Sequence, residues 1–131
     1  MQSHPPVVLI VGDHQDSLAM YAIGLLTMGF QPVTAGSSDV GFRRACDTHP
    51  EVIVADVRMP ASSGFDLTRR LREDDRTKDS GIILLIDQAS DSVMQQARDA
   101  GCDRLMLMPC LPDALALEIH DMLASRRHDL S

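Results

Sequence analysis

Short runs of apolar residues alternate along the chain with longer segments in which apolar residues recur every three or four positions. A continuous apolar run is typical of a strand that is buried on both faces of a parallel sheet. Such runs predict strands at residues 7–11, 52–55, 82–86 and 105–108. A weaker run at 32–35 begins with Pro32, which cannot donate a hydrogen bond to a neighbouring strand, so we expect this strand at an edge of the sheet.

The segments between these runs have the period of amphipathic helices. They predict helices over residues 16–28, 38–48, 63–73, 91–100 and 111–125. Ser63 is placed to cap the third helix, Gly101 to end the fourth, and Pro112 to occupy the first turn of the last. The first helix is expected to bury one face, formed by Leu18, Ala22, Leu25 and Leu26.

Strictly alternating strands and helices favour a parallel sheet with helices on both faces. We therefore expect an α/β fold, a single doubly wound (βα)5 domain of the flavodoxin-like type. Its parallel five-stranded sheet should have the strand order 2-1-3-4-5. The domain is expected to cover residues 7–125, with short tails at 1–6 and 126–131 and no room for a second domain.

The composition is that of a globular protein of 131 residues, with 44% hydrophobic residues and a net charge of -7. An acidic chain is a poor partner for nucleic acid, whose phosphates attract clustered lysine and arginine. No apolar run is long enough to span a membrane, and the first residues lack a signal-peptide pattern. The three cysteines are widely spaced, so we expect a cytoplasmic protein without disulfides.

Acidic residues follow three of the predicted strands. Asp13 comes just after the first strand, Asp56 after the third and Asp87 after the fourth. In a doubly wound sheet, ligands bind beyond the carboxyl ends of the strands, where the strand order reverses. We expect these carboxylates to approach one another there, because strands one, three and four are neighbours in the order 2-1-3-4-5. Clustered carboxylates repel unless a cation such as Mg²⁺ lies between them.

The residues around this crevice form a more specific pattern. Asp56, Met59, Pro60 and Gly64 give the stretch Asp-x-x-Met-Pro…Gly, and the first strand leads into Asp13. Over nearly the whole chain this pattern resembles the receiver domain of two-component response regulators. The segments that carry the resemblance are 8–16, 52–60, 64–67, 100–103 and 108–109.

The resemblance implies a role in phosphorelay signal transduction. Asp56 would accept a phosphoryl group from a sensor histidine kinase or a phosphotransfer protein. Mg²⁺ would be held by Asp13, Asp56 and the backbone carbonyl of Arg58. The resemblance further implies that the face formed by residues 91–100, 105–108 and 111–125 binds partners, including a second copy of the chain in a homodimer.

Four positions depart from the family pattern. Gly12 stands where a second acidic residue is usual, and Ile86 where the family has a serine or threonine that donates to the phosphoryl group. Met108 replaces the lysine before the last proline, and Leu105 replaces an aromatic switch residue. Together these changes predict an impaired phospho-switch. The alternative is a pseudo-receiver that acts as a phosphorylation-independent interaction module.

Three neighbours of the site leave alternatives open. Asp87 either repels an incoming phosphoryl group or supplies a replacement carboxylate for the metal. Arg58 either replaces the missing lysine or is a solvated loop residue. His14 either approaches the metal or faces water.

An enzyme on the same fold is disfavoured. Haloacid-dehalogenase-type phosphatases carry a second aspartate two residues after the first, where this chain has Arg58. A flavodoxin needs an uncharged phosphate loop after the first strand, whereas residues 12–16 are acidic. No combination of nucleophile and base is indicated.

Overall fold

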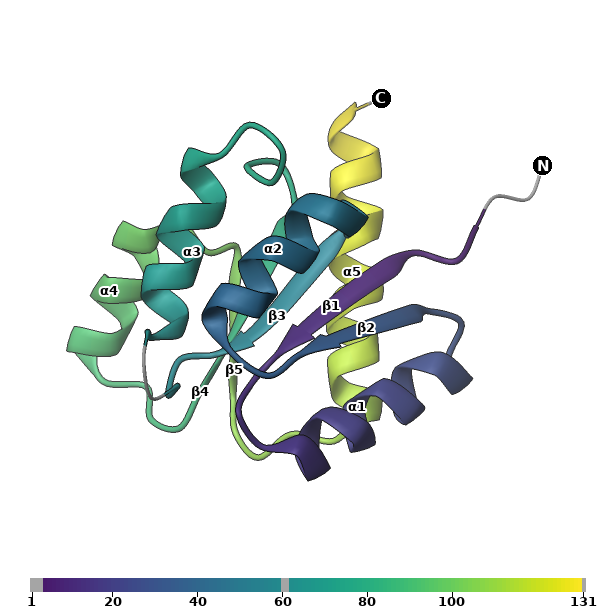
Figure 1. Cartoon of the computed structure of the whole chain (residues 1–131), viewed down its shortest axis with the longest axis horizontal. Coiled ribbons are helices and arrows are strands. Elements are labelled where there is room, and N and C mark those ends of the chain that lie inside the picture. Colours follow the sequence, from purple (N-terminus) through teal and green to yellow (C-terminus); the bar gives the residue numbers. More distant parts are fainter. Residues whose placement is uncertain (1–3, 60–61, 131) are drawn as a thin grey trace.

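The computed structural model describes residues 4–59 and 62–130, with no account of the side chains of 127–130. Strands and helices alternate strictly along the chain (Figure 1). The elements are β1 (Val7–Val11), α1 (Gln15–Thr27), β2 (Gln31–Ala35), α2 (Ser38–Thr48), β3 (Val52–Asp56), α3 (Gly64–Glu73), β4 (Gly81–Ile86), α4 (Asp91–Ala100), β5 (Arg104–Leu107) and α5 (Pro112–Leu130).

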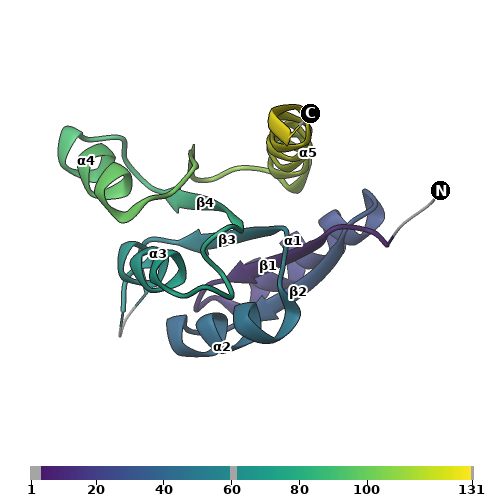
Figure 2. The ribbon, with the colours of Figure 1, turned by 90° about the horizontal axis from the view of Figure 1, so that it is seen from above.

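The strands form one parallel sheet in the order β2-β1-β3-β4-β5, which confirms the predicted fold. Pro32 lies in β2 at an edge of this sheet, as expected for a residue that cannot donate to a strand ladder. Figure 2 shows α5 and α2 on opposite sides of the sheet. The reversal of strand order at β1 and β3 places the carboxyl ends of these strands side by side.

A separate apolar cluster covers each face of the sheet. Successive strand residues point to opposite faces, so Leu9 belongs to one cluster and Ile10 to the other. The first cluster also takes residues from α2, α3 and α4, and the second takes residues from α1 and α5. Burial on both faces explains why β1, β3 and β4 read as continuous apolar runs.

The predicted helix ends at Ser63 and Gly101 are confirmed. The Ser63 hydroxyl accepts a hydrogen bond from the backbone N–H of Asp66 at 3.2 Å. Gly101 follows α4 with a φ of 97°, in the left-handed region that glycine adopts without strain. None of the helices within 4–59 and 62–130 is sufficiently long and apolar to cross a membrane.

Three expectations need correction. The last strand begins at Arg104 and ends at Leu107, one residue earlier than predicted. The last helix continues to Leu130, so residues 126–130 are helical rather than a tail. In α1, Leu26 is 62% exposed, and Tyr21 is buried in its place. The helix is apolar on all sides, so its sequence could not specify which apolar residues face the sheet.

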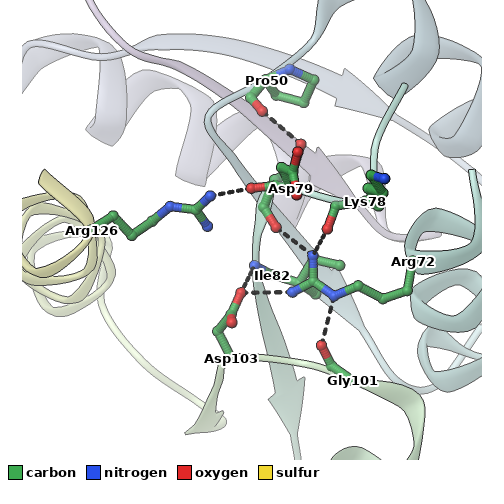
Figure 3. Close-up of polar contacts among 9 residues, drawn as sticks. Pro50, Arg72, Lys78, Asp79, Ile82, Gly101, Asp103 and Arg126 are labelled. Carbon is green, nitrogen blue, oxygen red and sulfur yellow. Dashed lines mark hydrogen bonds and ion pairs between the residues drawn. The ribbon is translucent and has the colours of Figure 1, made fainter. Parts of the chain in front are cut away.

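At the end of the sheet away from the acidic crevice, Arg72 connects several segments (Figure 3). Its guanidinium donates to the carbonyl oxygens of Gly101, Lys78 and Ser80 at 2.7 to 2.8 Å. It also donates to the Asp103 carboxylate at 2.8 Å, which in turn accepts from the backbone of β4. This one side chain therefore joins α3 to the start of β4, the end of α4 and the start of β5.

Candidate functional site

Asp13 and Asp56 line one small cavity at the carboxyl ends of the strands. Asp56 is the last residue of β3, and Asp13 lies two residues beyond the end of β1. The pairing of β1 with β3 brings these positions together although they lie 43 positions apart in sequence. The cavity has a volume of about 40 Å³. By the usual volume of a buried water, it has room for about three waters.

The Asp56 carboxylate is oriented by the backbone. Its Oδ1 accepts a hydrogen bond from the N–H of Arg58 at 2.9 Å. Gly64, the first residue of α3, packs directly behind it, since a β-carbon at Gly64 would lie 2.7 Å from the Asp56 carbonyl oxygen. The glycine of the sequence pattern is therefore required by the close approach of α3 to the end of β3.

His14 contacts Asp13 while remaining largely exposed. Its Nδ1 lies 3.0 Å from Oδ1 of Asp13. Of the two readings that the sequence left open, the structure shows an exposed ring that rests against the Asp13 carboxylate. The carboxylate itself borders the cavity.

Asp87 and Arg58 pair with each other at the surface. The guanidinium of Arg58 lies 3.1 Å from the Asp87 carboxylate, and both side chains are exposed. Neither residue lines the cavity that contains Asp13 and Asp56. Of the three carboxylates expected to approach one another, only Asp13 and Asp56 border this cavity.

Tyr21 is a residue of the site that the sequence did not indicate. Its hydroxyl donates to the Cys110 carbonyl oxygen at 2.7 Å and lies 3.7 Å from Sδ of Met108. Burial raises the pKa of Tyr21, and the Cys110 thiol and the negative charge of Asp56 act in the same direction, whereas the hydrogen bond with the Cys110 backbone acts against them. The phenol and the Met108 thioether thus form an uncharged wall of the cavity. The presence of a tyrosine in the apolar helix that follows Asp13 was the available signal, since buried tyrosines need a hydrogen-bond partner.

The other departures from the family pattern are also apolar or small. Ile86 is the last residue of β4 and is buried in the apolar cluster against which the half-buried Leu105 packs. Gly12 is buried beside Leu18. Met59 is buried, whereas Pro60 of the predicted stretch lies outside the described residues.

Within the part of the chain that the structure covers, no cluster of three or more His, Cys, Asp or Glu residues is placed to hold a metal.

Residues 8–120 match the profile of the response regulator receiver domain, so the chain belongs to this family. Receiver domains are signalling domains of two-component systems and are generally not enzymes. They typically bind Mg²⁺ at the phosphorylation site and interact with histidine kinases or phosphotransfer proteins.

Curated relatives include two transcriptional regulatory proteins. The chain is 28% identical over 116 residues to the phosphate regulon protein PhoB of Pseudomonas aeruginosa, covering 88% of this chain and 51% of PhoB. It is 31% identical over 121 residues to PrrA of Mycobacterium leprae, covering 92% of this chain and 51% of PrrA. The chain therefore spans about half the length of these relatives.

Solved structures share the fold. Chemotaxis protein CheY4 of Vibrio cholerae superposes with a TM-score of 0.85 at 24% identity, covering 89% of this chain and 98% of CheY4. A CheY-like receiver domain protein of Methanospirillum hungatei superposes with a TM-score of 0.88 at 19% identity, covering 95% of this chain and 98% of that one.

Proposed function

We propose that Asp56 is the phospho-acceptor of this receiver domain and that its phospho-switch is impaired. The observation that carries the proposal is the shared cavity of Asp56 and Asp13, with the Asp56 carboxylate oriented by the Arg58 N–H. An Asp56 oxygen would attack the phosphorus of a phosphohistidine, forming a P–O bond as the P–N bond breaks. The imidazole would leave with a proton, and Asp56 would carry an acyl phosphate.

The partner in this proposal is a cytoplasmic sensor histidine kinase or a phosphotransfer protein. The chain itself acts as a signalling module rather than as an enzyme on a separate substrate. A phosphatase of the haloacid-dehalogenase type would need a second aspartate two residues after Asp56. That position is Arg58, whose side chain pairs with Asp87.

Mg²⁺ fits the donors at this site in part. Asp13 and Asp56 offer hard carboxylate oxygens beside one small cavity, and the Arg58 backbone carbonyl would complete the protein ligands. Bound there, Mg²⁺ would neutralise charge on the transferred phosphoryl group. Two carboxylates give the site a charge of -2, which favours the cation. With Gly12 in place of a further acid, water must supply more of the ligands.

The impairment follows from the groups that surround the cavity. Ile86 has no hydroxyl to donate to a phosphoryl oxygen, and the Met108 thioether carries no charge. Arg58 is paired with Asp87 and does not line the cavity. The loss of one charge-assisted and one neutral hydrogen bond costs on the order of 2–4 kcal/mol. This corresponds to a decrease of roughly one to three decades in phosphoryl-transfer rate or phosphoryl stability.

A pseudo-receiver is the second candidate, and one observation favours it. Ion pairs of Arg104 with Glu118 and Asp121, at 2.7 and 2.6 Å, join β5 to α5 in the face formed by α4, β5 and α5. Leu107, at the end of β5, and Leu111, just before α5, are exposed. Such a face could bind a partner without any phosphoryl group on Asp56.

The test is incubation with phosphoramidate and Mg²⁺, followed by intact mass measurement. We expect slow addition of one phosphoryl group, its loss in Asp56→Asn, and its decrease when EDTA removes the metal. Met108→Lys, alone or with Ile86→Thr, should accelerate the addition by about tenfold or more. No addition to any of these variants would contradict the phospho-acceptor role and leave the interaction module as the better account.

A further inference from the structure

Among the described residues, three side chains with hydrogen-bond donors line the cavity that holds Asp56. They belong to His14, Ser17 and Tyr21. His14 rests against Asp13 and is largely exposed, and Ser17 is exposed as well. Tyr21 is the buried member of the three, with 3% of its surface exposed. Its hydroxyl is therefore a donor in the cavity wall that packing holds in place.

The Tyr21 hydroxyl lies beside the position where the family has a lysine. Met108 occupies that position, and its Sδ atom is 3.7 Å from the Tyr21 oxygen. Both side chains line the cavity together with Asp56. Burial is the main cause that raises the pKa of Tyr21, and the negative charge of Asp56 is a smaller cause in the same direction. A donor from α1 thus stands next to the place of the missing lysine.

The present partner of this hydroxyl can be exchanged for another. The O–H group donates to the Cys110 carbonyl oxygen at 2.7 Å, which is a neutral acceptor. The Cys110 Sγ atom, at 3.6 Å, and the Met108 Sδ atom are weak partners. A hydrogen bond to an anion is about twice as strong as one between neutral groups. A hydroxyl hydrogen can rotate to suit its partner, so an anion in the cavity would attract it without any movement of the ring.

A phosphoryl group on Asp56 would bring such an anion into the cavity. It carries negative charge on three acceptor oxygens. The cavity of about 40 Å³ has room for about three waters, so a group of this size on Asp56 would fill it and meet its walls. Arg58 pairs with Asp87 outside the cavity, and the Met108 thioether has no charge to offer. The phenol is the buried side-chain donor that borders the same space.

We propose that the Tyr21 hydroxyl donates a hydrogen bond to the phosphoryl group on Asp56, and that it leaves the Cys110 carbonyl oxygen when that group is present. The inference rests on the proposed function, because it requires Asp56 to be the acceptor. A neutral phenol contributes less than a lysine, so the phospho-switch remains impaired although a donor is present. Only the hydrogen moves, so the amides of residues 91–111 keep their partners.

The rate of phosphoryl addition from phosphoramidate and Mg²⁺, followed by intact mass measurement, tests the proposal. Tyr21→Phe keeps the ring and removes the hydroxyl. We expect it to slow the addition by about tenfold, as the loss of one hydrogen bond to a charged group does. Thr27→Val is the matched control, since the Thr27 hydroxyl also donates from α1 to a backbone carbonyl, that of Gly24 at 2.8 Å, but lies outside the cavity. Its removal should leave the rate unchanged.

A double-mutant cycle separates this role from support of the fold. In Met108→Lys the lysine supplies a donor, so Tyr21→Phe should then slow the addition by less than about twofold. If the phenol served only to hold the Cys110 carbonyl, its removal would cost the same factor whichever residue stands at position 108. Equal slowing in the two backgrounds therefore overturns the proposal.

Tyrosine fluorescence provides a second readout, which a structural role would not change. Tyr21 is the only tyrosine, and the chain has no tryptophan, so the emission comes from this residue alone. Beryllofluoride with Mg²⁺ is the probe, because it occupies the position of a phosphoryl group on a carboxylate. It should change the emission of the wild type and leave that of Asp56→Asn as it was. Unchanged emission in a wild type that adds a phosphoryl group contradicts the proposal, even if Tyr21→Phe does not fold.

Failure of this inference can be distinguished from failure of the proposed function. If the wild type and Met108→Lys both add no phosphoryl group, the proposed function is wrong and the role of Tyr21 falls with it. If the wild type adds one and a folded Tyr21→Phe adds it at the same rate, Asp56 remains the acceptor and only the role of Tyr21 is wrong. Slower addition in Ser17→Ala without any slowing in Tyr21→Phe assigns the donor to the exposed serine instead. Circular dichroism melting shows whether each variant is folded.

Discussion

Gly64 is the residue on which the position of Asp56 depends most directly. A β-carbon there would lie 2.7 Å from the Asp56 carbonyl oxygen and 2.9 Å from the Cα of Val57. Both contacts are with backbone, which cannot rotate away. We predict that Gly64→Ala lowers the free energy of unfolding by about 1–3 kcal/mol, as overpacking does. It should also reduce phosphoryl transfer to Asp56. Urea denaturation and intact mass measurement check the two effects.

Gly36→Ala is the matched control for this prediction. Its β-carbon would meet nothing within 4 Å, so the substitution should change unfolding by less than about 0.5 kcal/mol. If Gly64→Ala were as stable as Gly36→Ala, the close approach of α3 to β3 would not determine the geometry of the acceptor.

Tyr21 provides a spectroscopic report on the site. Tyr21 is the only tyrosine, and the chain has no tryptophan. The tyrosinate absorbance that appears at alkaline pH therefore comes from this residue alone. Burial raises its pKa in the folded protein, so the unfolded state ionises first as the pH rises. The stability is therefore complete below the ordinary pKa of about 10 and falls above it, by up to about 1.4 kcal/mol per pH unit.

Absorbance titration of native and urea-unfolded protein checks this expectation. The native curve should lie at higher pH than the unfolded one, and urea midpoints should fall as the pH is raised above 10. Tyr21→Phe should remove that decrease and lower stability at neutral pH by about 1 kcal/mol, because the Cys110 carbonyl loses its donor. Coincident native and unfolded curves would mean that the phenol is open to water.

The sequence indicated the acidic residues of the site but not their neighbours. Asp13 and Asp56 could be predicted because the strand order alone brings two strand ends together. The pairing of Arg58 with Asp87, and the bond from Tyr21 to Cys110, depend on side-chain directions in loops and on which face of α1 is buried. Neither direction has a periodic signal in the sequence.

At the scale of the elements, Arg72 is a single connection between α3, α4, β4 and β5 (Figure 3). Lysine cannot reproduce its planar set of donors. We predict that Arg72→Lys leaves carbonyl groups of Gly101 and Ser80 without partners and lowers the free energy of unfolding by about 2–4 kcal/mol. Thermal and urea denaturation provide the measurement.

Arg69→Lys is the control on the same helix. Arg69 pairs only with the exposed Asp66 among the described residues, at 2.7 Å, and surface pairs of this kind contribute about 0–1 kcal/mol. Equal stability of the two variants would show that the Arg72 contacts do not hold the ends of α4 and β5 in place.

Strands that are buried on both faces, and helices that bury one clear face, could be predicted from the sequence. The runs in β1, β3 and β4 and the caps at Ser63 and Gly101 gave accurate positions because each has a local physical cause. The errors lie in α1, where apolar residues surround the helix, in the bounds of β5, and at the end of α5. At the end of α5 the sequence has no stop signal such as a glycine after Ser125.

For the molecule as a whole, the question is whether a phosphoryl group at Asp56 reaches the face formed by α4, β5 and α5. In the family pattern, a hydroxyl at the end of strand four and an aromatic residue in strand five connect the two. Here Ile86 is buried among apolar residues and Leu105 packs against the same cluster. Neither can change a hydrogen bond when Asp56 is modified.

We therefore predict that phosphorylation changes hydrogen exchange only in the segments near Asp56. Amides of residues 12–17 and 56–59 should gain protection in the presence of phosphoramidate and Mg²⁺, whereas those of 91–111 should exchange unchanged. Ile86→Thr combined with Leu105→Tyr should extend the change to α4 and β5, because it supplies a donor to the phosphoryl group and a hydroxyl that can move with it. Wild-type protection changes across 91–111 would show that an apolar cluster alone can transmit the signal.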